Sequence, residues 1–67
     1  MYEVRRTANA HTNPTARDFT ILVSRHRNLG RAVVALTAAK AARSRRCGAG
    51  AWDMNIAVFE DGAYYLD

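Results

Sequence analysis

The stretch Ile56-Ala57-Val58-Phe59-Glu60-Asp61-Gly62-Ala63-Tyr64-Tyr65-Leu66-Asp67 decides how this chain folds. Asp-Gly between two apolar, β-prone runs predicts a β-hairpin, because a two-residue type I′ turn needs positive φ at both central positions. With a turn of that length, Phe59 faces Tyr64 and Val58 faces Tyr65. Both faces of the hairpin are then apolar. One carries Ile56, Val58 and Tyr65, and the other carries Ala57, Phe59, Tyr64 and Leu66.

A chain of 67 residues has material for one domain, so we expect residues 1–67 to form a single unit. A chain of this size buries only about 60% of its extended surface and does not support two cores. It therefore covers one hairpin face and leaves Phe59, Tyr64 and Leu66 available on the other. Exposed aromatic clusters are typical anchors of protein interfaces. The alternative is that the N-terminal loop or a second copy of the chain covers them.

Alternating apolar and polar side chains predict the remaining strands. Residues 2–6 form a short strand, and residues 7–18 follow as a polar loop in which His11 is solvated. Residues 19–24 form the second strand, with Phe19, Ile21 and Val23 on one face. The third strand runs over residues 52–59 and the fourth over residues 64–66. In the third strand the helix-facing side chains are Trp52, Met54, Ile56 and Val58.

The segment from Leu29 to about Arg45 predicts a helix by composition, with Ser24 or Asn28 as its N-cap and Gly48-Ala49-Gly50 as its end. Apolar residues recur at helical spacing along one side until the charged Lys40 and Arg43. This core face consists of Leu29, Ala32, Val33, Leu36 and Ala39. The order β-β-α-β-β predicts an α+β fold, a four-stranded antiparallel sheet with one helix packed on one face.

Ten basic side chains against six acidic ones give a net charge of +4 and a pI near 10.0. Nine of the ten are arginine, which suits planar contacts with phosphates and carboxylates. All ten lie within residues 5–46, whereas residues 52–67 hold four acids and no base. Such a dipolar chain presents a basic side to nucleic acid or to an acidic protein patch, and it does not fit an acidic DNA mimic.

The basic side chains around the predicted helix have two interpretations. As a functional surface they contact phosphate backbones, and as a solvated helix face they supply solubility. No aromatic side chains are interleaved with them, as base stacking would need. The set consists of Arg25, Arg27, Arg31, Lys40, Arg43, Arg45 and Arg46.

No catalytic constellation is visible, and we expect a protein that is not an enzyme and uses no cofactor or metal. His26 between two arginines is a poor general base. The single cysteine, Cys47, makes no intramolecular disulfide, which fits a reducing cytosol; it is either a thiol activated by its arginine neighbours or a small residue at a helix end. No run approaches the ~18 to 20 apolar residues of a membrane span, so we expect a cytoplasmic protein without membrane association.

The hairpin at residues 56–67 resembles the closing hairpin of small phage-encoded anti-CRISPR proteins that act on type I-F surveillance complexes. Matching in kind and place are Ala57, Glu60, Asp61, Gly62 and Asp67. Ala39-Lys40, followed by Ser44 and Cys47, is similar to the end of the helix in that family. The resemblance implies a stoichiometric inhibitor that docks on Cas proteins and blocks target DNA hybridisation, with Lys40 as a binding position.

Three hypotheses follow. The first is an anti-CRISPR inhibitor in the cytosol of an infected bacterium, whose partner-binding residues are Lys40, Arg31, Arg43, Arg45, Phe59, Tyr64 and Leu66. The second is a small nucleic-acid-binding module or phage accessory protein that uses Arg25, Arg27, Arg31 and Arg46. The third is a homodimer that meets through the outer hairpin face.

Overall fold

Four strands and one long helix make up the fold in the computed structural model, which describes residues 1–9, 12–47 and 55–67, with the backbone alone over 43–47. The elements are β1 (Tyr2–Arg6), the 3₁₀ turn η1 (Ala16–Asp18), β2 (Ile21–His26), α1 (Leu29–Cys47), β3 (Ile56–Glu60) and β4 (Ala63–Leu66). The strands lie in the order β2-β1-β3-β4, and every neighbouring pair is antiparallel. This confirms the predicted α+β fold.

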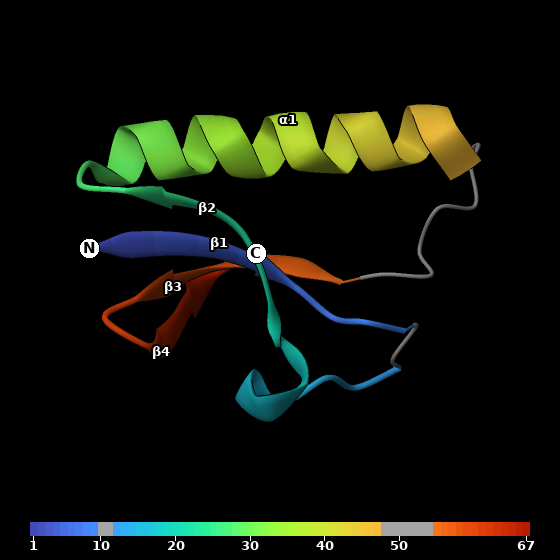
Figure 1. Ribbon diagram of the computed structural model, residues 1–67, viewed down its shortest axis with the longest axis horizontal. Coiled ribbons are helices and arrows are strands. Elements are labelled where there is room, and N and C mark those ends of the chain that lie inside the picture. Colours follow the sequence, from blue (N-terminus) through green and yellow to red (C-terminus); the bar gives the residue numbers. More distant parts are fainter. Residues whose placement is uncertain (10–11, 48–54) are drawn as a thin grey trace.

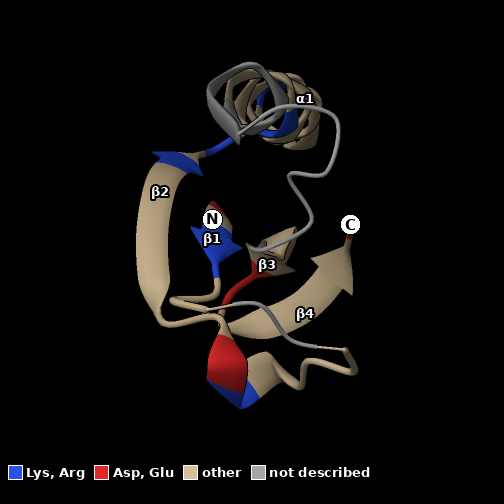
Figure 2. Cartoon of the chain, turned by 90° about the vertical axis from the view of Figure 1, so that its right-hand side faces the viewer, with Lys and Arg blue, Asp and Glu red and all other residues tan. Residues whose placement is uncertain are grey.

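The helix and η1 lie on opposite sides of the strands, as Figure 1 and the end-on view in Figure 2 both show. β2 and β3 are each antiparallel to β1, so they run parallel to one another with β1 between them. A parallel pair needs a crossover connection, and α1 supplies it. The central position of β1 therefore gives it strand neighbours on both edges, a helix on one face and η1 on the other.

The hairpin turn forms as predicted. Asp61 has φ 49° and Gly62 has φ 88°, the positive values that a type I′ turn requires. The start of the chain fastens this turn: the Asp61 N–H donates to the Met1 carbonyl at 3.0 Å, and the Met1 ammonium lies 3.1 Å from the Asp61 carboxylate. The turn is thereby joined to the beginning of β1.

The core between helix and sheet consists of Val4, Ala32, Leu36, Ile56 and Val58. Asn28 is the N-cap of α1, since its Oδ1 accepts from the Arg31 N–H at 3.2 Å. The predicted helix face is confirmed at Ala32, Leu36 and Ala39. Leu29 is only half-buried and Val33 is 37% exposed, whereas Ala35 packs on the core. The reason is that the buried stripe is centred on Ala32, Leu36 and Ala39; Ala35 is three residues from Ala32 and four from Ala39 and so lies beside the stripe, whereas Val33 is turned further away from it.

A second, smaller core lies on the opposite face of the sheet and contains Phe19, Ala57 and Phe59. The prediction that Phe59 stays available is therefore wrong: its side chain is 0% exposed. Its ring is covered by Phe19, with 5.3 Å between the ring centroids. Phe19 is the C-cap of η1 rather than the first residue of β2, so the loop that leads into β2 brings it under the sheet.

A β-bulge corrects the predicted pairing of β3 with β4. Phe59 pairs with Tyr64 as expected, but Val58 pairs with Leu66 and Tyr65 is passed over. One extra residue in a strand moves the following side chain to the other face. Leu66 consequently packs on the core beneath the helix, not on the outer face where it was predicted. The predicted positions of His11, Trp52 and Met54 lie outside the described residues.

Candidate functional site

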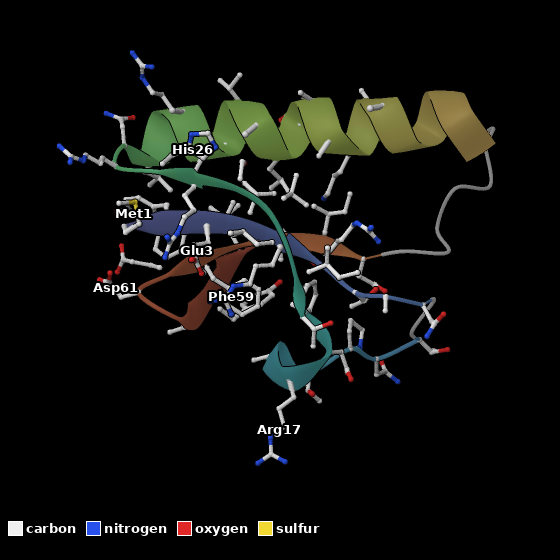
Figure 3. The ribbon with its side chains drawn as sticks, viewed as in Figure 1. Met1, Glu3, Arg17, His26, Phe59 and Asp61 are labelled. Atoms are coloured by element: carbon white, nitrogen blue, oxygen red, sulfur yellow. The ribbon has the colours of Figure 1, made fainter. Side chains whose placement is uncertain are left out.

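Glu3 is the centre of an ionic cluster on the sheet face opposite the helix. Its carboxylate accepts from Arg5 Nε at 2.9 Å and from Arg5 Nη2, and its other oxygen accepts from Arg25 Nε at 3.0 Å. The strand register explains this: Glu3 pairs with Arg25 across β1 and β2, and Arg5 is two residues further along β1 on the same face. Figure 3 shows where Glu3 and Phe59 lie relative to the strands.

The two arginines keep the Glu3 carboxylate ionised. Hydrogen bonding from Arg5 is the main cause that lowers the pKa of Glu3, and the Arg5 charge and the Arg25 hydrogen bond act in the same direction. Burial of the side chain, which is only 12% exposed, opposes them by raising the pKa. The two arginines outweigh burial because a partly buried carboxylate that accepts hydrogen bonds from two guanidinium groups is more stable charged than neutral.

Arg5 is engaged on two sides within the protein. Its guanidinium carbon lies 4.8 Å from the centroid of the Phe59 ring, in the range of a cation–π contact. Tyr64 meets the same ring edge-on at 5.7 Å and 83°. The ring of Phe59 thus forms a floor that supports Arg5 from β1, Phe19 from the η1 segment and Tyr64 from β4.

Arg25 is engaged on one side only. Its Nε binds Glu3, its side chain is 64% exposed, and no residue in the described ranges accepts from its two terminal nitrogens. Glu3 therefore orients the plane of this guanidinium while its terminal edge stays in solvent. The two terminal nitrogens of that edge can donate together to one carboxylate or phosphate in the end-on bidentate manner.

A shallow groove of about 450 Å³ lies beside this cluster, open to solvent. Arg17 from η1 stands at its rim and extends away from the sheet (Figure 3). The 3₁₀ turn that carries Arg17 is held by Asp18, whose carboxylate accepts from the Thr15 N–H at 2.8 Å. The lining residues are Glu3, Arg5, Ala16, Arg17, Phe19, Thr20 and Leu22.

The residues proposed from the sequence fall into separate regions. Tyr64, 46% exposed, and the buried Phe59 lie on the groove side of the sheet, whereas Lys40 and Arg31 lie exposed on the helix. Lys40 Nζ donates to the backbone oxygen of Asp67, which brings the helix to the end of β4. Arg25 and Arg27 are exposed at the end of β2. The side chains of Arg43, Arg45, Arg46 and Cys47 lie outside what the structure describes.

Sequence reasoning missed Glu3, Arg5, Arg17 and Leu22 as parts of one site. A signal was present in β1, because Glu3 and Arg5 are two residues apart in a predicted strand and must share a face. The contribution of Arg25 depended on the register between β1 and β2, and Arg17 reaches the groove through η1. The register has no local sequence signature. The capping box of Thr15 and Asp18 marks the turn η1 but does not show that it lies beside β1.

The comparisons add no relative: no family model matches the chain, and no match is found among the curated proteins or the solved structures. Across the residues that the structure describes, no three His, Cys, Asp or Glu side chains gather in an arrangement that would hold a metal ion. Among those same residues, no helix has both the length and the apolar character to cross a membrane. The arginine-rich sheet face is thus the feature on which a functional argument can be built.

Proposed function

We propose that this chain is a non-catalytic binding protein of the anti-CRISPR kind, which docks on Cas proteins of a type I surveillance complex and blocks target DNA binding. The observation that carries the binding role is the Arg25–Glu3–Arg5 cluster above the Phe59 ring. Arginine and tyrosine anchors held on a rigid element are typical of protein interfaces. The choice of partner is supported by the resemblance of the hairpin at residues 56–67 to the anti-CRISPR family.

Electrostatics favours an acidic surface on that partner. The chain carries +4, and Arg17, Arg25 and Tyr64 are exposed on the sheet face away from the helix. An acidic patch opposite such a face speeds association and selects the orientation of docking. The Arg5 guanidinium contacts Glu3 and the Phe59 ring, so its role is to hold these side chains in place and not to contact the partner.

The direct test is capture of purified type I complexes, the type I-F complex first, by the immobilised protein. Tyr64→Ala should weaken capture by about tenfold, since an exposed aromatic anchor is removed. Tyr65→Ala is the matched control, because Tyr65 is 45% exposed against 46% for Tyr64 but contacts Tyr2 instead of Phe59. Lys40→Glu tests the position that the resemblance supplies.

The same complexes should lose binding of a target duplex when the protein is added at equal concentration. Absence of capture for the unmodified protein would remove the inhibitor hypothesis. Capture without loss of DNA binding would keep docking and reject inhibition. Equal capture by the two tyrosine variants would show that the groove side of the sheet is not the contact surface.

A second candidate, nucleic-acid binding, is favoured by the arginines at the junction of β2 and α1. Arg27 is exposed, and Arg31 lines a depression of about 510 Å³ together with His26, Asn28, Gly30 and Val34. Phosphate contacts of this kind give binding that weakens steeply with salt. A gel shift with random duplex at low salt tests it, and no shift there would exclude it.

Homodimerisation stays a prediction, but the dimer contact cannot be the surface that the sequence suggested. The original hypothesis placed Phe59 and Leu66 on an open face, whereas Phe59 is fully buried and Leu66 packs beneath the helix. A substitution at Leu66 would disturb the core, so loss of a dimer in such a variant would not locate the interface. Light scattering of the unmodified protein over a concentration series measures the oligomeric state directly.

A further inference from the structure

The groove beside the Glu3 cluster has the apolar side chain of Leu22 in its wall, and the fixed cationic edge of Arg25 adjoins it because Arg25 binds the lining residue Glu3. Arg25 presents its two terminal nitrogens outward because Nε is bound to Glu3. Leu22 pairs with Arg5 across the strands, lies on the same sheet face and is 49% exposed. A ligand for this groove therefore needs an anionic group for Arg25 and an apolar group for Leu22.

The position of β2 favours an extended ligand. β2 is an edge strand of the described sheet, with β1 as its one partner. A β-bulge at Val23 and the charge of Arg25 discourage indiscriminate pairing along this edge. Recognition thus depends on side chains of the ligand that meet Leu22 and the two exposed arginines, Arg17 and Arg25.

Burial of the aromatic rings argues against nucleic acid in this groove. Phe19 is 4% exposed and Phe59 0%, so neither ring has a free face on which a base could stack. The Glu3 carboxylate also lies in the floor, where it would repel a regularly spaced phosphate backbone. A peptide can space its carboxylates so that they meet the arginines and avoid Glu3.

We propose that this groove binds an extended acidic peptide segment, with one carboxylate on the terminal edge of Arg25 and an apolar side chain against Leu22. Glu3 acts as a positioning residue that orients Arg25. The inference rests on the proposed function in one respect: the segment would belong to the protein on which this chain docks. Arg17, at the rim, meets a second carboxylate of the segment.

The test is fluorescence anisotropy with a labelled, capped peptide in which Glu and Val alternate, at physiological salt. The same peptide with Gln for Glu should not bind. Arg25→Gln should weaken binding by about tenfold, the value of one charge-assisted bidentate contact. Arg25→Lys should weaken it by about fivefold although the charge is kept, because an ammonium group lacks the planar edge.

Ala38→Glu is the matched control, since it lowers the net charge by the same unit at an exposed position on the helix. It should change binding by less than about twofold at physiological salt. Amide NMR of the complex should show the largest shifts in residues 3–5 and 16–26, which hold the groove-lining side chains and Arg25. Urea unfolding of each variant confirms that it is folded at the assay temperature.

Several outcomes would overturn the proposal. Equal binding by Arg25→Lys and the unmodified protein would show that net charge, not geometry, attracts the peptide. A loss for Ala38→Glu as large as for Arg25→Gln would show the same. Preference for a single-stranded oligonucleotide over the peptide would assign the groove to nucleic acid. Because the probe is an isolated peptide, this test can fail while capture of the CRISPR complex succeeds, and the reverse.

Discussion

Phe59→Ala is the substitution that most sharply tests the second core. The Phe59 side chain is 0% exposed, and three groups contact its ring: Phe19 at 5.3 Å, Tyr64 at 5.7 Å and the Arg5 guanidinium at 4.8 Å. Truncating a buried phenylalanine costs about 3–5 kcal/mol. The two ring pairs and the cation–π contact favour the upper part of that range.

That loss is large against the stability of so small a domain. Small domains have a free energy of unfolding of about 0.05–0.15 kcal/mol per residue, which gives about 3 to 10 kcal/mol for a chain of 67 residues. Since 1 kcal/mol shifts Tm by about 4–8 °C at this size, Phe59→Ala should lower Tm by about 15 °C or more. A protein at the low end of the range would be largely unfolded at 25 °C.

Urea unfolding followed by far-UV circular dichroism measures the change. Phe59→Leu fills most of the space without the ring contacts and should cost about 1.5 kcal/mol. Tyr64→Ala, at a half-exposed ring, should cost about 1 kcal/mol or less. If Phe59→Ala shifts the free energy of unfolding by no more than Tyr64→Ala, the ring is not enclosed by Phe19 and the second core does not exist.

Three further outcomes follow from individual contacts. Arginine partners lower the pKa of Glu3 in the folded state. The ionised carboxylate therefore stabilises the fold fully at pH values above the ordinary glutamate pKa of about 4.3. This contribution is lost as the pH falls through the lower pKa of the folded state. Glu3→Gln should therefore unfold more easily at pH 7 and show a flatter decline in acid, measured by urea unfolding from pH 7 to pH 2. Gly62→Ala should cost about 1 kcal/mol because φ at this turn position is +88°; an unchanged urea midpoint would contradict the type I′ turn. Asn28→Ala should cost about 1 kcal/mol through loss of the N-cap of α1, and Ser24→Ala, at the other predicted cap position, serves as the comparison.

The features that could be read from the sequence share a local cause. Asp61-Gly62 specified its turn because few residue pairs accept positive φ. Asn28 directly precedes the run of periodic apolar residues, and its side chain caps the N-terminus of the helix. Such features involve residues close in sequence, so composition and spacing carry them. The candidate site was poorly predicted because it is assembled from β1, β2, β3 and η1 through long-range pairing.

The sequence by itself determined the α+β class, the order of the elements and the basic character of the chain, since each depends on local propensity or on charge. The tertiary structure decided which faces are covered. Phe19 reaches Phe59 across forty residues, and a bulge moves Leu66 beneath the helix. The free edge of Arg25 likewise exists only because the register places it opposite Glu3. Burial and register depend on how the elements pack together. They decide that Phe59 belongs to a second core and is not an exposed aromatic anchor.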